Sequence, residues 1–534
     1  YLPQVIEEFN SAYENGTDPV TGKRLTSSDK KIFVKGEPGS SGTIHSYIVN
    51  AVNGINTSQV SKPTIFSPSV GHWLRLVNYE TNREVFKLNE AVPTANAPVV
   101  MAIWESRLNL IKAKNPNKAI GWEQLLEVLR SPNGWADYGV RDGSHKKIYY
   151  GHTDPFVSST ALSTLIAEYF ASAKYLANKE DLEQLTMENV KDEKIQEQVK
   201  QIEKLIKHYS SRTTEFKEYI AQGPNYLDFV ALEENDLIYI NQGKTAYKPP
   251  EKLVALYPKE GTYVHEHPFA VPYTDWVTDE QREAAKKFTD YVLTEKVQRL
   301  VMENGFRPAN TSITLADPIS MNNGVDPSEP RAILPIPAPE TIMTIQQNWH
   351  FVKKRGLVYV LLDTSGSMDG QKLDNAKSAI QVFAEKMPTE NQVGMIGFSN
   401  QVDEITPIDL LETNKSRLLL GLTEIYAEGG TAMYDGLLKT IDIMNERKDA
   451  DTIRAIVMLS DGKDNRSKSS LYDVVNVLEQ LQQSDNPIMV VPVAYGNDAD
   501  ISALNAIARA SSTKVQVGDT GDIGKLLEVI SSYF

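Results

Sequence analysis

The chain of 534 residues contains no cysteine. This absence excludes thiol catalysis, disulfide bonds and cysteine-bound zinc, so the fold does not depend on the redox state of its compartment. No run of about 18 apolar residues occurs, so the sequence predicts no membrane-spanning helix. The chain has no Lys/Arg block and a net charge of −15, which argues against nucleic-acid binding.

Signatures of catalysis are also missing. The sequence has no His-Glu-x-x-His zinc motif, and Ser158 and Ser159 lie outside any Gly-x-Ser-x-Gly elbow. His265-Glu266-His267 lacks the spacing of a metal site on one helix face, and we interpret these residues as a loop. The sequence therefore predicts a protein that is not an enzyme.

Length and composition indicate a globular protein of more than one domain. A chain of 534 residues is too long for a single core, and 41% hydrophobic with 23% charged residues is ordinary for globular domains. The sequence begins at Tyr1 rather than at methionine. We therefore expect that an upstream segment was removed, such as a signal peptide or a lipid-anchored leader that tethers the protein to a membrane.

A continuous apolar run stops abruptly at an aspartate between Leu357 and Met368. Such a run predicts a strand buried on both faces that ends at the carboxyl edge of a parallel sheet, where α/β folds bind ligands. Asp363, Ser365 and Ser367 alternate after the strand, and the glycine between the serines permits a compact turn. One carboxylate and two hydroxyls are hard oxygen donors, which suit Mg²⁺.

This Asp-x-Ser-x-Ser sequence resembles the metal-ion-dependent adhesion site of the von Willebrand factor A domain. Two further loops of the family pattern follow in order: a Gly-Gly turn before Thr431, and Asp461 directly after an apolar strand. The resemblance implies a doubly wound, Rossmann-like α/β domain over residues 357–534. It also implies that Mg²⁺, or Mn²⁺ or Ca²⁺, is held by five residues and keeps one open position for an Asp or Glu of a protein partner: Asp363, Ser365, Ser367, Thr431 and Asp461.

The first 310 residues resemble a second family. Four features occur in the order found in bacterial extracellular solute-binding proteins of the two-lobed type II periplasmic class: the loop 39–43, the strand 97–104, the turn 257–262 and the helix that ends at 305–308. The resemblance implies an α/β domain with one lobe from residues 1–98 plus 268–310 and another from 99–267. Residues 311–356 are predicted to be a proline-rich linker with a short helix over 340–349.

Hydroxyls cluster at two predicted helix starts in this domain. By the resemblance, Ser40 and Ser41 contact a ligand from one lobe and Ser158 and Ser159 from the other, with Ser67 and Asp154 as secondary candidates. Free N–H groups at helix starts favour a small polar or anionic solute. Two alternatives stay open: these serines are ordinary helix caps, or the cleft has lost its ligand and serves as a rigid spacer.

Local patterns predict further elements. Strands are expected over 31–35 and 236–241, one helix over 278–302, and a charged, solvated helical excursion over 179–217. In the C-terminal domain we expect helices over 372–387, 431–444, 469–482 and 501–509, strands over 393–398 and 488–494, and an antiparallel edge strand over 402–405.

These patterns predict an extracytoplasmic binding protein, either periplasmic or at the cell surface, with or without a lipid anchor. Its metal site would serve protein–protein interaction, and its cleft would hold a solute. The alternative is the solute receptor of an ABC-type transporter, with the A domain as a docking module. A metal-dependent hydrolase is a more distant third interpretation.

Overall fold

The computed structural model describes the chain from residue 1 to 534 except for 56–59, 141–147, 177–181, 211–212, 225, 448–451, 483, 485–486, 497, 512, 514, 519–522 and 532. The described residues form two compact units. The first comprises Tyr1–Arg130, Tyr149–Ile202 and Arg212–Trp349, and the second comprises Ser131–Ile148, Glu203–Ser211 and His350–Phe534. Helix α13 (Pro339–Val352) spans the boundary between the units.

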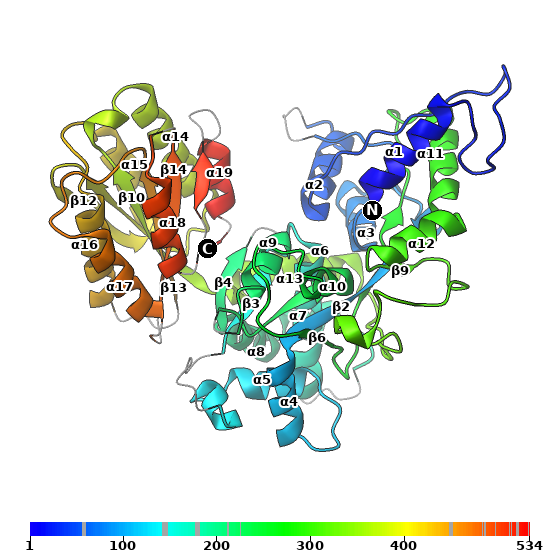
Figure 1. Ribbon diagram of the computed structural model, residues 1–534, viewed down its shortest axis with the longest axis horizontal. Helices are drawn as coiled ribbons and strands as arrows, with labels where there is room; N and C mark the ends of the chain where they lie inside the picture. Colours follow the sequence, from blue (N-terminus) through cyan, green and yellow to red (C-terminus); the bar gives the residue numbers. More distant parts are fainter. Residues whose placement is uncertain are drawn as a thin grey trace. The chain divides into compact units, whose positions relative to one another are not determined.

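Strand β2 (Ala95–Trp104) organises the first unit (Figure 1). Its beginning pairs with β9 (Arg307–Pro308) and β7 (Val264–His265), and the rest lies between β5 (Phe229–Glu233) and β6 (Leu253–Leu256). A separate short ladder joins β1 (Val92–Pro93) to β8 (Pro268–Phe269). The chain therefore crosses through this region several times, and the lobe limits predicted at 98/99 and 267/268 fall at these crossing strands.

One end of the first unit packs helices on the start of β2. Phe9 of α1 (Leu2–Glu14), Phe288 of α11 (Asp279–Val292) and Val301 of α12 (Glu295–Glu303) share a buried apolar cluster with Ala95. Helices α2 (Ser41–Val52) and α3 (His72–Thr81) follow each other in the sequence and pack against each other.

The other end of the first unit is built around the second half of β2. Its remaining strand is β3 (Tyr150–Thr153), and its helices are α4 (Glu105–Lys114), α5 (Trp122–Leu129), α6 (Ser159–Ala171), α7 (Met187–Lys191), α8 (Glu193–Glu203), α9 (Thr213–Ile220) and α10 (Glu234–Asn241). All residues of α6 are buried, which makes it the central helix of this part. Trp104, Phe216 and Leu237 are among the residues of its core.

Both strand predictions outside the sheet are wrong. Residues 31–35 form no strand, and the side chain of Asn10 instead pairs with both the N–H and the C=O of Val34 at 2.8 Å. Residues 236–241 belong to helix α10, because Leu237, Ile238 and Ile240 point into the core while Tyr239 is exposed. A short run of apolar residues is compatible with a strand or with a helix, and here the helix is the structure that buries these side chains.

Two helical predictions need correction as well. The helix expected over 278–302 is interrupted at Leu293, and α12 begins after Thr294, whose hydroxyl donates to the Tyr291 carbonyl at 2.7 Å. The segment expected to be a solvated excursion over 179–217 contains α7, α8, α9 and the strand β4 (Ile206–Ser210). Its sparse apolar residues are buried, among them Val199.

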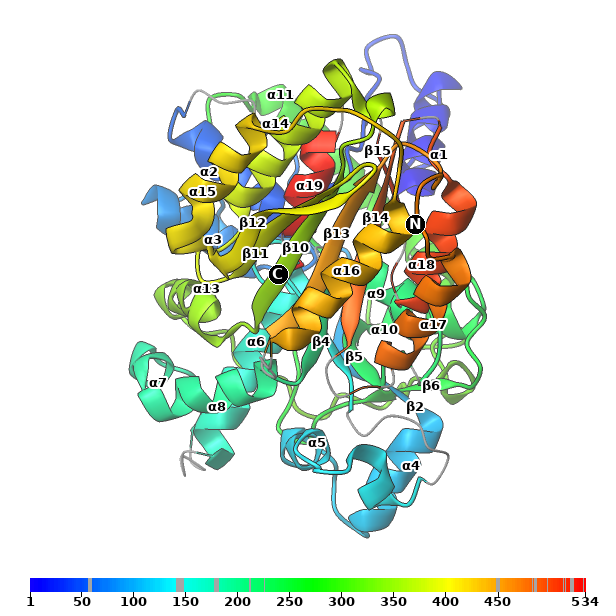
Figure 2. The same ribbon diagram turned by 90° about the vertical axis from the view of Figure 1, so that its left-hand side faces the viewer.

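The second unit has a six-stranded sheet in the order β12-β11-β10-β13-β14-β15 (Figure 2). The strands are β10 (Arg355–Asp363), β11 (Gln392–Phe398), β12 (Val402–Leu410), β13 (Thr452–Ser460), β14 (Ile488–Tyr495) and β15 (Gln516–Gly518). All neighbours are parallel except β12, which runs antiparallel to β11. The predicted antiparallel edge strand is thus confirmed.

Helices cover both faces of this sheet. The buried core on one face includes residues of α16 (Met433–Glu446), α17 (Leu471–Gln482) and α18 (Ile501–Ala510). On the other face α14 (Gln371–Lys386) packs against α19 (Ile523–Ser531), and α15 (Leu411–Thr423) packs on β12 (Figures 1 and 2). This is the doubly wound α/β arrangement predicted from the sequence. The expected helices, and the strands expected over 393–398 and 488–494, lie within a few residues of their predicted limits, whereas the edge strand β12 extends five residues beyond the predicted 405 and helix α15 was not predicted.

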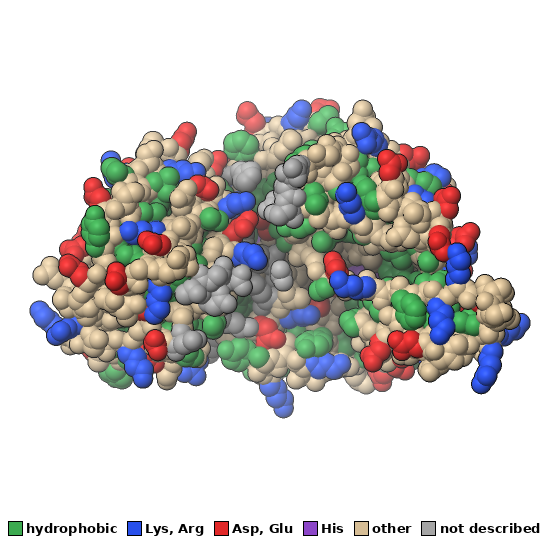
Figure 3. Space-filling view, turned by 90° about the horizontal axis from the view of Figure 1, so that it is seen from above, with side chains coloured by type: hydrophobic (Ala, Val, Ile, Leu, Met, Phe, Trp, Pro, Cys, Tyr) green, Lys and Arg blue, Asp and Glu red, His purple; other side chains and the backbone are tan. Residues whose placement is uncertain are grey.

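The surface carries both signs of charge. Acidic and basic side chains are interspersed over the face seen in Figure 3. Within the described ranges, we find no helix with the length and apolar composition needed to cross a bilayer.

Candidate metal centre

The predicted metal ligands come together at the carboxyl ends of two adjacent strands of the second unit. Strand β10 ends at Asp363, and its parallel neighbour β13 ends at Ser460, directly before Asp461. Asp363 and Asp461 are both fully buried. Because parallel strands in register end at the same edge, the two carboxylates come from loops that emerge side by side.

Hydrogen bonds link these groups into one network. Asp363 Oδ1 accepts from the Ser365 N–H at 2.9 Å, and Asp363 Oδ2 accepts from the Ser460 hydroxyl at 2.7 Å. The hydroxyls of Ser365 and Ser367 lie 3.0 Å apart, and Ser367 Oγ donates to Asp461 Oδ1 at 2.7 Å. Burial raises the pKa of Asp363, and the bonds from the two serines oppose this shift.

Thr431 is held against the loop that follows Asp461. Its N–H donates to Asn465 Oδ1 at 2.9 Å, and its carbonyl accepts from the N–H of Asn465 at 3.0 Å. A side-chain carbon added at Gly462 would lie 3.7 Å from Ser367 Oγ and 3.8 Å from Thr431 Oγ1. The absence of a side chain at this glycine therefore leaves open the space between the two hydroxyls.

The donor set fits a divalent cation. Two carboxylates and the hydroxyls of Ser365 and Ser367 are linked by hydrogen bonds, and the hydroxyls of Ser367 and Thr431 border the space next to Gly462. All are hard oxygen donors. Asp363, Ser365, Ser367, Thr431 and Asp461 are the residues that would hold the ion. Their role as metal ligands stays a prediction.

Sequence reasoning missed two residues of this network. Ser460 donates to Asp363, and Lys372 Nζ lies 2.6 Å from Asp461 Oδ2. Ser460 could have been found, since it ends a strand that the apolar pattern places next to β10. Lys372 lies in the first turn of α14, and no spacing rule connects it to Asp461.

The predicted solute residues occupy the start of α2, the start of α6 and the loop between β3 and α6, except for Ser67, which lies on the segment before α3. Gly42 N–H donates to the Val157 carbonyl at 3.1 Å, so the first turn of α2 contacts this loop directly. Ser159 Oγ accepts from Trp73 Nε1 at 2.9 Å, which joins α6 to α3. These contacts bring the two predicted serine pairs to one region of the first unit.

Several of these side chains also have structural partners. Ser158 caps α6 by accepting from the Ala161 N–H at 3.2 Å, and its hydroxyl lies 2.8 Å from that of Thr213. Ser41 Oγ accepts from the Ser69 N–H at 3.1 Å, and Asp154 accepts from the Phe156 N–H at 2.8 Å. The capping interpretation therefore describes Ser158 well.

Ser40 and Ser67 differ from the others. Ser40 is the N-cap residue of α2 in position, but its side chain makes no capping hydrogen bond. Ser67 is exposed on the segment that precedes α3. Ser40 therefore has the position of an N-cap residue, but its hydroxyl does not cap the helix.

A buried network that sequence reasoning missed lies at the crossing strands. His265 Nδ1 is 2.7 Å and His267 Nε2 is 3.3 Å from the carboxylate of Glu233, and Ser163 Oγ is 2.9 Å from His265 Nε2. Burial would raise the pKa of Glu233, but the two histidines lower it below its ordinary value. The loop prediction for His265 is wrong, since it lies in β7.

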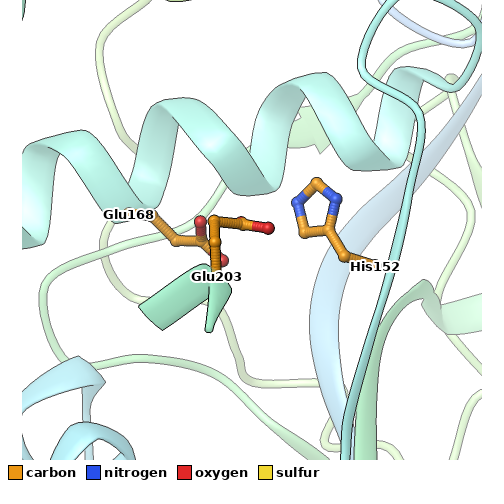
Figure 4. Close-up of side chains that lie close together, drawn as sticks. All are labelled: His152, Glu168 and Glu203. Carbon is orange, nitrogen blue, oxygen red and sulfur yellow. The ribbon is translucent and has the colours of Figure 1, made fainter. Parts of the chain in front are cut away.

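Figure 4 shows the side chains of three further buried ionisable residues, His152, Glu168 and Glu203. In the first unit Glu168 of α6 accepts from the Tyr150 hydroxyl at 2.9 Å, and His152 Nδ1 lies 2.6 Å from the Thr153 carbonyl. Glu203 belongs to the second unit, where it accepts from Tyr209 at 2.8 Å.

Comparison with known protein families identifies both parts of the chain. Residues 78–326 match the bacterial extracellular solute-binding protein family, and residues 358–528 match the von Willebrand factor type A domain. The chain therefore joins a solute-binding domain to a C-terminal von Willebrand factor A domain. The description of the first family points to an extracytoplasmic location.

Relatives among curated proteins match only part of this chain. The inter-alpha-trypsin inhibitor heavy chain H2 of Mesocricetus auratus is 28% identical over 180 residues, which are 32% of this chain and 18% of that protein. An uncharacterized protein of Synechocystis sp. is 26% identical over 152 residues, or 28% of this chain and 35% of that protein. The chain thus spans well under half the length of these relatives.

Two solved structures are also similar. A von Willebrand factor type A protein from Catenulispora acidiphila has a TM-score of 0.31 and 20% identity, and the match covers 34% of this chain and 42% of that one. The second is proximal thread matrix protein 1 of the mussel byssus, with a zinc-occupied metal-ion-dependent adhesion site (MIDAS) motif. It has a TM-score of 0.29 and 16% identity, and the match covers 33% of this chain and 47% of that one.

We predict that His72 makes the first unit sensitive to acid. Burial, with smaller contributions from His265 and Arg75, lowers the pKa of His72 to about 3. At acidic pH the His72 side chain therefore binds a proton in the unfolded chain but not in the folded chain. The free energy of unfolding thus falls as the pH drops below the ordinary histidine pKa of about 6.5. Between pH 7 and pH 4.5 the loss attributable to this residue should be about 2.5 kcal/mol.

The measurement is urea unfolding at the two pH values, followed by tryptophan fluorescence. Five of the six tryptophans lie in the first unit and only Trp135 in the second, so the signal reports mainly on the first unit. His72→Phe keeps a ring beside Tyr263, whose ring centroid is 5.2 Å from that of His72, and should lose less stability between pH 7 and 4.5 than the wild type. An equal loss in both proteins would contradict the assignment.

Proposed function

We propose that this chain is an extracytoplasmic binding protein that captures an acidic side chain of a protein partner through a Mg²⁺-dependent adhesion site. The observation that carries this proposal is the convergence of Asp363 and Asp461 with the hydroxyls of Ser365 and Ser367 at one sheet edge. A carboxylate from another protein is the ligand that best completes an incompletely neutralised divalent ion.

The residues of the proposed metal site have different roles. Asp363 supplies negative charge from a fixed position, since both of its oxygens accept hydrogen bonds. Ser365 and Ser367 present neutral oxygens, which leave the ion short of negative charge. Thr431, held by Asn465, faces the same space from a separate loop. When bound, the metal would act as the electrophile that a partner carboxylate completes.

We further propose that the protein binds and does not catalyse. A hydrolase acting at the metal centre would need a general base, and the sequence contains no histidine after residue 350. Ser163, His265 and Glu233 have the order of a nucleophile, base and acid, but Ser163 is 1% exposed and lies within helix α6. A substrate could not reach that hydroxyl, and the network is better explained as a cross-link between elements.

For the first unit we propose a small polar or anionic solute between the start of α2 and the loop before α6. The contacts of Gly42 with Val157 and of Trp73 with Ser159 support this region as the place where the lobes meet. An acceptor-rich ligand suits it, because helix starts offer N–H donors. The match to an extracellular solute-binding family also favours the second candidate function, a transport receptor with the A domain as docking module.

Gene order separates these candidates. A transport receptor is expected beside genes for a permease and an ATPase, whereas an adhesion protein is not.

Metal binding is tested with Asp363→Ala. This substitution removes one of the two carboxylates and should abolish the thermal stabilisation by Mg²⁺ seen in the wild type. Differential scanning and isothermal titration calorimetry provide the measurement, and Asp369→Ala, which removes an exposed carboxylate from the same loop region, is the matched control. Equal Mg²⁺ affinity in the Asp363 variant and the wild type would refute the site.

Partner recognition is tested with immobilised peptides that present a central Asp or Glu, compared with the same peptides carrying Asn or Gln. Binding should require the carboxylate, should disappear in EDTA, and should fall by at least about tenfold in Thr431→Ala. Binding that persists in chelator would exclude carboxylate capture by a metal, even if the metal site itself proved real.

Solute binding is tested by screening oxyanions and sugars against the tryptophan fluorescence of the intact protein. Trp73 donates to Ser159, so a ligand that changes the contact between lobes should alter its emission. Ser40→Ala should weaken binding of an active compound, while Ser67→Ala, at an exposed position, should have less effect. If no compound changes the fluorescence or the small-angle scattering profile, the rigid-spacer interpretation is favoured.

A further inference from the structure

The side chain of Lys372 reaches into the metal centre. Its ammonium nitrogen lies 2.6 Å from Asp461 Oδ2, and the Asp461 side chain is fully buried while that of Lys372 is 28% exposed. The other oxygen of the same carboxylate accepts from Ser367 at 2.7 Å. Both oxygens of Asp461 are therefore occupied by groups of the chain itself.

Lys372 is fixed in the first turn of α14. Its carbonyl accepts a hydrogen bond from the Tyr495 hydroxyl at 3.0 Å. A side-chain carbon added at Gly496 would lie 3.7 Å from Lys372 Cε and 3.9 Å from Nζ. The backbone is thus held by the end of β14, and the ammonium group is directed along the β14 loop to Asp461.

The ion pair between Lys372 and Asp461 changes the net charge of the metal site. Two buried carboxylates without a cation repel each other and are costly to desolvate. One ammonium group beside them leaves a single net negative charge. A divalent ion at the same carboxylates would have to overcome the repulsion of that ammonium group or displace it.

We propose that Lys372 is a built-in counter-ion that competes with the metal for Asp461 and thereby sets the metal concentration at which the adhesion site becomes active. The inference rests on the proposed metal-dependent function and assigns its regulation to one side chain. Because ammonium and metal favour the same carboxylate, each lowers the affinity of the other. The chain without metal is stabilised by Lys372, and loading requires that this stabilisation be given up.

The test compares Mg²⁺ titrations of the full chain with three variants. Lys372→Gln removes the charge and should lower the Kd for Mg²⁺ by about tenfold. Lys372→Arg keeps the charge and should stay closer to the wild type. Lys463→Gln removes the same charge from an exposed position two residues after Asp461, and should change the Kd by less than about twofold.

Thermal unfolding provides a second readout that a purely structural lysine would not give. In the absence of metal, Lys372→Gln should unfold at a lower temperature than the wild type, because two buried carboxylates lose their counter-ion. In Mg²⁺ the difference should shrink or reverse. A lysine needed only for packing would lower the unfolding temperature equally in both conditions, and that result would overturn the inference.

The outcomes separate this inference from the proposed function. If the wild type binds Mg²⁺ and Lys372→Gln binds no more tightly, the counter-ion role is refuted while the metal site stands. If only Lys372→Gln binds Mg²⁺, the counter-ion role is supported and the metal-dependent function of the wild type is refuted. If neither protein binds Mg²⁺, both are refuted.

Discussion

The burial of Asp363 is the constraint on which the second unit depends. A carboxylate with no exposure at the end of a central strand is tolerated only where hydrogen bonds or positive charge compensate it. The Ser365 N–H and the Ser460 hydroxyl bond its two oxygens, and this requirement fixes the loops after β10 and β13 against each other. The geometry that makes the site able to receive a cation is thus the same geometry that makes the buried charge acceptable.

The sheet supports this arrangement through its register. Seven residue pairs from Leu357 to Asp363 align with β11, and the ladder with β13 ends one residue earlier at Leu362. A shift by one residue would move Asp363 to the opposite face of the strand. The apolar side chains of both faces, such as Val360 and Leu361, are buried under helices and prevent such a shift.

Much of the fold of the second unit and of its candidate metal site could be predicted from the sequence. Long apolar strands such as 357–362 and amphipathic helices such as α14 carry strong periodicity, so the doubly wound sheet and the order of its loops could be predicted. The five candidate ligands lay in motifs next to these strands. Short segments were less certain, and residues 236–241 formed a helix because burial of Leu237, Ile238 and Ile240 outweighed their strand-like composition.

Contacts between distant segments could not be predicted in the same way. The pairing of Lys372 with Asp461 and the network of Ser163, Glu233 and His265 join residues far apart in the chain, and they depend on where loops and helices end in space. Single-sequence periodicity contains no information on such pairs. The same holds for Asn10, whose side chain replaced the strand partner expected for Val34.

Helix α13 connects the two units by a short covalent route. Within the first unit Gln346 Nε2 donates to the Pro155 carbonyl at 3.0 Å, in the loop that carries Asp154 and precedes Ser158. The helix ends at Val352, and β10 begins at Arg355. Only two residues therefore separate a helix anchored to the predicted solute loop from the strand that leads to Asp363, so the chain has little slack in which to absorb a displacement of that loop.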